Sequence, residues 1–455
     1  MTSPRRVVIT GLGIVSPLGY DLATFWHLLS RGESGIGLIS AFDTSPFASS
    51  LAGEVHNFDA TDFIPHKEAR RMGRVSHFAV ASALMAVRHA QLDLSKENRD
   101  DTAVCFGTSV GGLKEAFAAH DAALQKRRLH PFTMTATFPN AVSAEVAIAL
   151  GVHGGCETYS VGCSSTANAV GRACDLIRSG HADVVIAGGA EAPLHPTIFA
   201  AMEAGRVLAP DLGGTVRNLP RPFDHTRCGI VLGEGAGCVV IEEYQHARDR
   251  GARMYAELEG WAFTCDAYSM ARPMESGQEQ TRAIHQALVG SRWFPEEVDY
   301  ISVCGLGSIE LDAVETASVK KALGTRAYRI PMSSLKSALG HAFAASGAFQ
   351  IIATALVLEH QFIPPTLHLT TPDPSCDLDY VAVRGRPARV RRTLINSFGF
   401  GGKNIVLALS QVQATPSHET VRQERDWETV HELPVGVYSH SGIPGHATTP
   451  QRTPE

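Results

Sequence analysis

The sequence predicts an α/β fold, and two features of its pattern lead to that class. Short, nearly continuous apolar runs rich in β-branched residues end in glycine turns at residues 5–13, 101–112, 181–191, 237–244 and 300–307. Longer runs with apolar residues at helical spacing lie between several of them, as in residues 67–93 and 349–360. Such apolar strands are typical of sheets covered by helices on both faces. Their alternation with helices therefore predicts stacked layers of helices and buried sheets.

The first and last segments of the chain differ in character from the middle. Residues 5–13, "RRVVITGLG", hold a short apolar run broken by glycine, which predicts a buried first strand and a turn, not a signal peptide. From residue 411 the composition shifts to Pro, Thr, His and charged residues, which predicts a disordered tail over 411–455. Both halves of the remaining chain carry strand, glycine-turn and helix units, a pattern that permits an internal duplication.

Composition narrows the function classes. The chain has 455 residues, a net charge of −6 and 44% hydrophobic residues, enough to bury one or two large cores. The mildly acidic charge gives no electrostatic basis for nucleic acid binding. No apolar run reaches the roughly 18 residues of a transmembrane helix, so no membrane association is expected. We expect a cytoplasmic protein without a cofactor.

The cysteines support a reducing compartment. There are nine, an odd number, and none forms a CxxC pair, which argues against a disulfide framework or a zinc site. No metal site is therefore expected. A cysteine in such a chain is most often a small buried hydrophobic residue, so a chemical role needs local evidence.

Cys163 has such evidence. Residues 157–161 predict a strand, and from Ser165 the apolar residues follow helical spacing, which places Cys163 in a tight strand-to-helix turn after Gly162. Amides at a helix N-terminus stabilise a thiolate and lower its pKa, and a sharp turn exposes the sulfur. The alternative is a cysteine that only fills space.

Candidate partners occur in two later segments. "LKSALGH" holds Lys336 and His341 before an apolar helix, and an imidazole donates to an oxyanion or accepts a proton. A packed or capping histidine and a solvated lysine are the ordinary alternatives. "NSFGFGGKN", residues 396–404, places three glycines around two phenylalanines, which indicates a backbone loop close to a ligand or simply a tight turn.

Together these segments resemble the β-ketoacyl synthases of the thiolase superfamily, in particular the 3-oxoacyl-[acyl-carrier-protein] synthase II-like condensing enzymes of fatty acid and polyketide synthesis. The likeness runs from residue 5 to about residue 409. It rests on "GCSST" around Cys163, "RPFDHTRCGIVLGEGAG" over residues 221–237, "LKSALGH" and "NSFGFGGKNIVLAL". It implies a five-layered αβαβα thiolase-like fold of two similar halves, residues 1–250 and 251–410. It also implies a dimer that acts as an acyltransferase with acyl carrier protein as its partner.

The resemblance implies a role for each matching residue. Cys163 would take the acyl chain as a thioester, and its amide and that of Phe400 would form the oxyanion hole. His341 would assist decarboxylation of the malonyl extender, Lys336 would orient the site, and Phe400 would act as a gate. The residues expected to contact substrate are Ser308, Phe398, Gly399 and Gly401, and those expected to support the nearby turn are Asp312 and Glu315.

The chain departs from the family pattern at residue 304. The family segment reads His-Gly-Thr-(Ser/Gly)-Thr, whereas this chain reads "CGLGS", so Cys304 replaces one catalytic imidazole. A thiol is a weak donor, and loss of one oxyanion donor typically costs on the order of 100-fold to 1000-fold in rate. "GHAFAASGA" also replaces "GHxxGAAGA", Lys403 stands where threonine is common, and Gln350 replaces a glutamate that contributes to an internal cation site in some members.

These departures leave three functions open. The chain condenses acyl and malonyl units with His341 alone, or it passes the acyl group from Cys163 to an O, N or S acceptor without decarboxylation. The third is a non-catalytic, chain-length-factor-like partner of a ketosynthase heterodimer, but such subunits usually lack the cysteine. Cys304 itself is a passive filler, a weak donor to the substrate, or half of an oxidised pair with Cys163 that switches the enzyme off.

Overall fold

Ten strands form one mixed sheet, in the order β11-β10-β14-β15-β9-β1-β8-β6-β4-β5. The computed structural model describes residues 5–211 and 219–413, and the described residues up to Val412 form one compact unit. The predicted tail over 411–455 lies outside the described residues apart from its first three positions. The ten strands are β1 (Val7–Val15), β4 (Thr102–Gly107), β5 (Cys156–Tyr159), β6 (Val184–Glu191), β8 (Gly235–Glu243), β9 (Ala256–Cys265), β10 (Tyr300–Ser302), β11 (Met332–Ser333), β14 (Arg392–Gly399) and β15 (Lys403–Ser410).

The sheet consists of two copies of one five-stranded pattern. In each half the third strand in chain order lies at the outer edge, followed by the second, fourth, fifth and first strands. The second strand pairs parallel with its two neighbours, and the remaining pairs are antiparallel, in both halves. The halves meet through a short antiparallel contact between β1 and β9. The repeated order is direct evidence for the duplication that the sequence only permitted.

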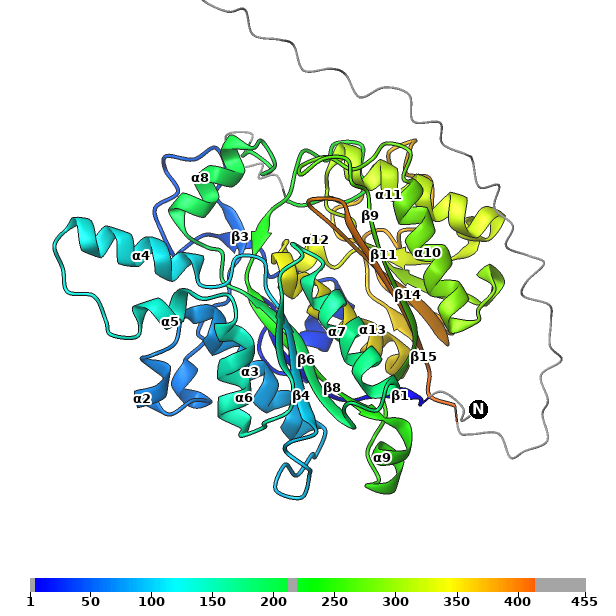
Figure 1. The fold of residues 1–455 in the computed structure, drawn as a ribbon. Coiled ribbons are helices and arrows are strands. Elements are labelled where there is room, and N and C mark those ends of the chain that lie inside the picture. Colours follow the sequence, from blue (N-terminus) through cyan, green and yellow to red (C-terminus); the bar gives the residue numbers. More distant parts are fainter. Residues whose placement is uncertain (1–4, 212–218, 414–455) are drawn as a thin grey trace, which may run out of the picture. The chain divides into compact units, whose positions relative to one another are not determined.

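Helices complete five layers. The central layer is α7 (Ser165–Arg178) and α13 (Phe343–His360), which contact strands of both halves. The outer face of the first half is covered by α3 (Arg74–His89) and α6 (Ala141–Leu150), and that of the second half by α10 (Gln278–Ser291) and α11 (Ile309–Leu323). Figure 1 shows α7 and α13 among the strands, with α3 and α6 on one side and α10 and α11 on the other. The predicted five-layered αβαβα fold is confirmed.

The remaining helices and strands lie outside the ten-stranded sheet and the six helices named above. They are α1 (Leu22–Arg31), β2 (Gly37–Leu38), β3 (Leu51–Gly53), η1 (Ala60–Asp62), α2 (His66–Ala69), α4 (Leu113–Leu124), α5 (Thr133–Thr137), α8 (Pro196–Ala204), β7 (Leu232–Gly233), α9 (Tyr244–Asp249), η2 (Pro295–Glu297), η3 (Gly324–Arg329), α12 (Lys336–Leu339), β12 (Phe362–Ile363) and β13 (Arg386–Pro387).

Local sequence explains why the layers pack closely. All nine residues of β1 are buried, and a Cβ at Gly13 would lie 2.0 Å from the Ser82 carbonyl of α3, so only glycine allows this approach. Contrary to the expectation that no apolar run reaches such a length, α13 alone among the described helices is long and apolar enough to cross a membrane, and 89% of it is buried inside the fold. Its apolar surface therefore packs in the core of the protein.

The duplication brings the candidate residues together. Cys163 and His341 each lie between the third strand of their half and a central helix: Cys163 between β5 and α7, His341 between β11 and α13. The turn that contains Cys304 follows β10, which pairs parallel with β11 and β14. Since the carboxyl ends of parallel strands meet at one edge of a sheet, the chemistry-bearing turns converge.

Candidate active site

Cys163 lies in the predicted strand-to-helix turn. Gly162 has a φ of +73°, which favours glycine, and α7 begins two residues after Cys163. The next side chain fixes the turn, because the Ser164 Oγ lies 2.9 Å from the Ser397 carbonyl and 3.1 Å from that of Lys403. Cys163 itself is buried, with 7% of its surface exposed.

The protonation state of Cys163 differs from the sequence prediction. Burial raises the pKa of the Cys163 thiol to about 12, and the neighbouring Cys304 contributes in the same direction. The prediction that the helix N-terminus gives Cys163 a lowered pKa is therefore wrong, because loss of solvation outweighs the helix amides. The Cys163 thiol is therefore neutral at neutral pH, and a role as nucleophile would require a base.

His341 is placed to be that base. Its Nε2 lies 3.1 Å from the Cys163 Sγ, and its Nδ1 lies 3.2 Å from the Oγ of Ser346. Burial, with a smaller contribution from the Lys336 charge, lowers the pKa of His341 well below its usual value. The ring is therefore neutral, and a neutral imidazole with a free Nε2 lone pair accepts the thiol hydrogen.

The glycine-rich loop closes over the sulfur. A Cβ at Gly399 would lie 3.3 Å from the Cβ and backbone N of Cys163, a tight contact that glycine relieves. The backbone N–H of Phe400 donates to the Cys163 sulfur and lowers its pKa slightly. Gly401 has a φ of +75°, and its N–H donates to the Met270 carbonyl over 2.9 Å. The amide of Phe400 therefore faces the reacting position.

Two buried carboxylates hold the turn around Cys304. The Glu315 carboxylate accepts the N–H groups of Cys304 and Gly305, each at 2.8 Å. The Asp312 carboxylate accepts the N–H groups of Leu306 at 2.8 Å and Gly307 at 3.1 Å. Burial raises the pKa of both acids, while these backbone donors act in the opposite direction. These hydrogen bonds hold the backbone of the turn in place.

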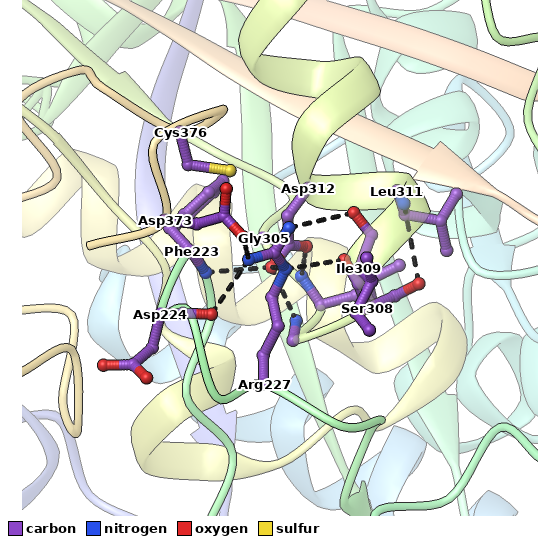
Figure 2. A network of polar contacts seen from close by, with 12 residues as sticks. Phe223, Asp224, Arg227, Gly305, Ser308, Ile309, Leu311, Asp312, Asp373 and Cys376 are labelled. Carbon is purple, nitrogen blue, oxygen red and sulfur yellow. Dashed lines mark hydrogen bonds and ion pairs between the residues drawn. The ribbon is translucent and has the colours of Figure 1, made fainter. Parts of the chain in front are cut away.

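Further polar contacts link this turn to residues 221–237. The Asp312 carboxylate also accepts the N–H of Phe223 at 2.9 Å and lies 3.6 Å from the Arg227 guanidinium. Arg227 in turn donates to Asp373 at 2.8 Å and to the Ile309 carbonyl at 2.9 Å. Figure 2 shows Arg227 among Asp312, Asp373 and the start of α11. The long sequence signature therefore supports the turn that contains Cys304, and its Cys228, Gly229 and Ile230 line the same cavity as Cys163.

Cys304 turns toward the protein. Its thiol donates to the Phe398 carbonyl over 3.2 Å, and burial raises its pKa to about 11. Lys336 donates to the Cys304 carbonyl at 2.6 Å, and its Nζ lies 3.9 Å from the Cys304 Sγ. Lys336 therefore fixes the position of the Cys304 backbone, consistent with an orienting role.

A cavity of about 420 Å³ opens onto the nucleophile. Its lining includes Cys163 and His341 together with the residues predicted to contact substrate or to gate it: Ser308, Phe398, Gly399, Phe400 and Gly401. Among the described residues, Cys304 and Lys336 are absent from this lining, and Cys304 borders a separate space of about 10 Å³. Ser308 is also the N-cap of α11, where its Oγ accepts from the Leu311 N–H at 3.5 Å.

Two polar side chains at the site were not predicted from the sequence. Gln280 on α10 borders both spaces, is 2% exposed, and its Oε1 accepts no hydrogen bond from the described residues. Ser346 contacts the His341 imidazole. Ser346 lay inside the departing stretch "GHAFAASGA", which was a usable signal, whereas a glutamine near a helix start gives none.

The internal cation site of some family members does not fit this chain. The Nε2 of Gln350 lies 3.0–3.3 Å from the carbonyl oxygens of Ser302, Val303 and Asn396 and from the Ser302 hydroxyl. An amide nitrogen donates hydrogens and cannot ligate a cation. It therefore occupies the point on which the oxygens converge. No group of three or more His, Cys, Asp or Glu side chains suited to a metal ion occurs in residues 5–211 and 219–413.

Comparison with known proteins agrees with this geometry. Two family descriptions match in chain order: "Beta-ketoacyl synthase, N-terminal domain" over residues 4–247 and "Beta-ketoacyl synthase, C-terminal domain" over residues 255–370. A 3-oxoacyl-[acyl-carrier-protein] synthase 2 of Synechocystis sp. is 41% identical over 90% of this chain and 99% of its own length. One of Staphylococcus aureus strain COL is 36% identical over 91% of this chain and 100% of its own length.

Solved structures give the same result. A chain described as "The ishigamide ketosynthase/chain length factor" matches with a TM-score of 0.85 and 33% identity, covering 90% of this chain and all of that one. A type II PKS acyl-carrier protein in complex with its ketosynthase bound to the hexaketide matches with a TM-score of 0.82 and 32% identity, with the same coverage. Both are similar along the whole ketosynthase-like fold.

Proposed function

Because the chain belongs to the β-ketoacyl synthase family, we propose that it condenses a Cys163-bound acyl group with a malonyl-type extender carried on acyl carrier protein. One observation carries the proposal: His341 Nε2 lies 3.1 Å from Cys163 Sγ at the end of a cavity of about 420 Å³. A subunit without catalytic function has no need to keep this pair assembled. The acyl product would serve fatty acid or polyketide synthesis.

Acyl transfer uses Cys163 and the loop above it. The thiol proton moves to His341 Nε2 as the sulfur attacks the thioester carbonyl of the carrier. The N–H groups of Cys163 and Phe400 receive the oxyanion that forms. The carbon–sulfur bond to the pantetheine then breaks, and the departing sulfur takes the proton from Nε2. The carrier leaves as a free thiol, and Cys163 holds the acyl chain.

Decarboxylation and condensation use the imidazole in its donor form. The bond between the malonyl α-carbon and its carboxylate breaks, carbon dioxide leaves, and the electron pair forms an enolate. An N–H at His341 Nε2 stabilises the enolate oxygen. The enolate carbon attacks the acyl carbonyl on Cys163, a carbon–carbon bond forms, and the Cys163 sulfur leaves and regains one proton from solvent. The product is a chain two carbons longer on the carrier.

We also infer a dimer with a second ketosynthase-like subunit, identical or different. The edge strand β5 leaves one side of the ten-stranded sheet unpaired within the chain, and such edges pair readily with another chain. Helix α6, which contacts β5, exposes Ile148, and the segment before α6 exposes Phe132, Met134 and Phe138. Apolar exposure beside an open edge is typical of an interface. Light scattering of the protein alone, and of the protein co-expressed with a second ketosynthase, tests this.

The expected location of the protein is the cytoplasm.

The function is tested by following Cys163 through both half-reactions. Purified protein is mixed with acyl-loaded carrier protein and then with malonyl-loaded carrier protein, and intact-protein mass spectrometry follows each species. We expect the wild type to become acylated, to release carbon dioxide and to form a product two carbons longer. We expect no acylation of Cys163→Ala.

Two results would redirect the proposal. Acylation without release of carbon dioxide would contradict condensation and indicate transfer to an O, N or S acceptor. No acylation at Cys163 under any loading would contradict both enzymatic functions and favour a non-catalytic partner subunit.

A further inference from the structure

Ser346 is the one polar side chain that the described structure places against the far nitrogen of the catalytic imidazole. It lies in the first turn of α13 and is 5% exposed. Its Oγ accepts the Ala342 N–H at 2.9 Å and lies 3.2 Å from His341 Nδ1. The other ring nitrogen lies 3.1 Å from Cys163 Sγ. A continuous polar chain thus runs from Ala342 through the imidazole to the nucleophile.

A hydroxyl at this point leaves both tautomers of the ring available. A serine hydroxyl has one hydrogen and two lone pairs, and the Ala342 N–H uses one lone pair. The other lone pair and the hydrogen remain for Nδ1. The hydroxyl therefore accepts from an Nδ1–H or donates to a bare Nδ1, whereas a backbone N–H at this point would only donate. In the stretch that "GHAFAASGA" replaces, this position is alanine.

The two half-reactions require opposite tautomers. Cys163 is a neutral thiol, so acyl transfer needs a bare Nε2 that accepts its proton, with the ring hydrogen on Nδ1. Decarboxylation needs a hydrogen on Nε2, with Nδ1 bare. Two imidazoles could divide these tasks, but this chain has Cys304 in place of one of them, and its thiol donates to the Phe398 carbonyl. His341 has to serve in both.

We propose that Ser346 is a positioning residue that lets His341 act as proton acceptor in acyl transfer and as hydrogen-bond donor in decarboxylation. The inference rests on the proposed function. Ser346 accepts the Nδ1 hydrogen while Nε2 takes the Cys163 proton and returns it to the departing thiol. Between the half-reactions the ring exchanges protons with water that enters through the cavity: Nε2 takes one proton from water and the Nδ1 proton is released to water, with no net change in charge. Ser346 then turns its hydrogen toward Nδ1.

The test compares Ser346→Ala with Ser346→Thr, which keeps the hydroxyl. In Ser346→Ala the Ala342 N–H is left to donate to Nδ1, which holds the hydrogen on Nε2 and removes the base. Single-turnover acylation of Cys163 by an acyl-pantetheine thioester at pH 7 should fall roughly 100-fold, the low end for a lost general base. The remaining acylation rate of Ser346→Ala should increase as the pH rises toward the pKa of the Cys163 thiol. Its rate of carbon dioxide release should stay within about threefold of wild type.

The controls separate a positioning role from a structural one. Thr354→Val removes another buried hydroxyl of α13, one without a partner, and should leave both rates and the pH profile unchanged. Ser346→Thr should keep the wild-type profile. Nitrogen-15 NMR of ring-labelled histidine reads the tautomer directly and needs no turnover. We expect the His341 hydrogen on Nδ1 in the wild type and on Nε2 in Ser346→Ala.

Each failure has its own signature. Ser346→Ala with a wild-type acylation rate and pH profile, or with an unchanged ring tautomer, overturns the inference and leaves the proposed function standing. Equal loss of acylation and carbon dioxide release in Ser346→Ala also overturns it, since that pattern indicates a structural defect. A wild type that acylates but releases no carbon dioxide contradicts the proposed function and with it the donor half of the inference.

Discussion

The thiol of Cys304 donates a hydrogen bond to the Phe398 carbonyl, 3.2 Å away, and this contact turns it toward the loop that carries Phe400. Of the described residues that line the cavity above Cys163, none is Cys304. The Cys304 thiol therefore does not border that cavity, whereas His341 does. We expect the imidazole chemistry of the site to fall on His341.

Cys304→Ala should condense at a rate within about threefold of wild type, because the thiol's hydrogen bond goes to the protein and a lost weak hydrogen bond costs little. His341→Ala should lose on the order of 100-fold or more, as expected for removal of an oxyanion donor. Product formation from acyl- and malonyl-loaded carrier protein, followed by mass spectrometry, measures both. A loss above about tenfold in Cys304→Ala would show that the thiol contacts the substrate.

Gln350→Glu should create a dependence on monovalent cations that the wild type lacks. A carboxylate placed among the carbonyl oxygens of Ser302, Val303 and Asn396 is repelled by them unless a cation intervenes. The variant should melt lower in choline chloride and recover about 2 °C or more in roughly 100 mM KCl, since a bound ligand stabilises the folded state.

The matched control for this change is Gln361→Glu. The Gln361 Nε2 also donates to two carbonyls, those of Leu358 and Val390, but its Oε1 accepts a backbone N–H, so the site is complete without an ion. Its melting temperature should not respond to potassium. Equal potassium effects on both variants, or none on Gln350→Glu, would contradict the idea that Gln350 stands in for a cation.

How much of the site was predictable depends on the kind of information each feature needs. The turn at Cys163 and the start of α7 at Ser165 follow from local spacing, so the sequence predicted both. The convergence of Cys163 with His341 joins segments 178 residues apart, and the sequence indicated it only through the family resemblance. Residue patterns along one strand or helix carry no information about such a distance.

Other features depend on burial and on side-chain direction. The raised pKa of Cys163 comes from its burial in the fold, which a local motif does not show. The direction of the Cys304 thiol is set by the Phe398 carbonyl on β14, a partner 94 residues away. The free Oε1 of Gln280 follows from the shape of two spaces lined by several elements. These are properties of the packed protein.

The stability of the protein should fall between about pH 6.5 and pH 9 because of His246. Hydrogen bonding to Glu242 raises the His246 pKa to about 9, with Glu97 contributing and burial opposing. Its Nδ1 lies 2.7 Å from Glu242 and its Nε2 3.0 Å from Glu97. A histidine whose folded pKa exceeds the unfolded value stabilises fully below the unfolded value and loses that contribution as pH rises through the folded value.

The contribution of His246 is about 1–3 kcal/mol after discounting for its partial exposure. Urea unfolding at pH 6 and at pH 9.5 measures it, with His246→Gln as the variant and the exposed His27→Gln as the control. The wild type and His27→Gln should lose this increment between the two pH values, and His246→Gln should not. The same pH response in all three proteins would rule out this histidine as the titrating group.

Asp312→Ala should destabilise the fold by about 3–5 kcal/mol, because it leaves the buried Arg227 with one carboxylate partner in place of two. It also frees the N–H groups of Phe223, Leu306 and Gly307, each now within 3.1 Å of the Asp312 carboxylate. The turn that contains Cys304 should loosen as a result. We expect the rate of carbon dioxide release to fall more than the rate of Cys163 acylation. The reason is that Cys163 lies in a separate turn, the one before α7.

The control is Glu310→Ala, in the same first turn of α11 but exposed, where loss of a favourable charge near the helix N-terminus costs about 0.3–1 kcal/mol. Urea unfolding compares the two variants, and the two half-reactions are timed in each. If Asp312→Ala lowers the free energy of unfolding by no more than Glu310→Ala does, the hydrogen bonds of the Asp312 carboxylate are not what holds the turn that contains Cys304. If acylation and carbon dioxide release fall equally in Asp312→Ala, the turn supports the whole site and not the malonyl side alone.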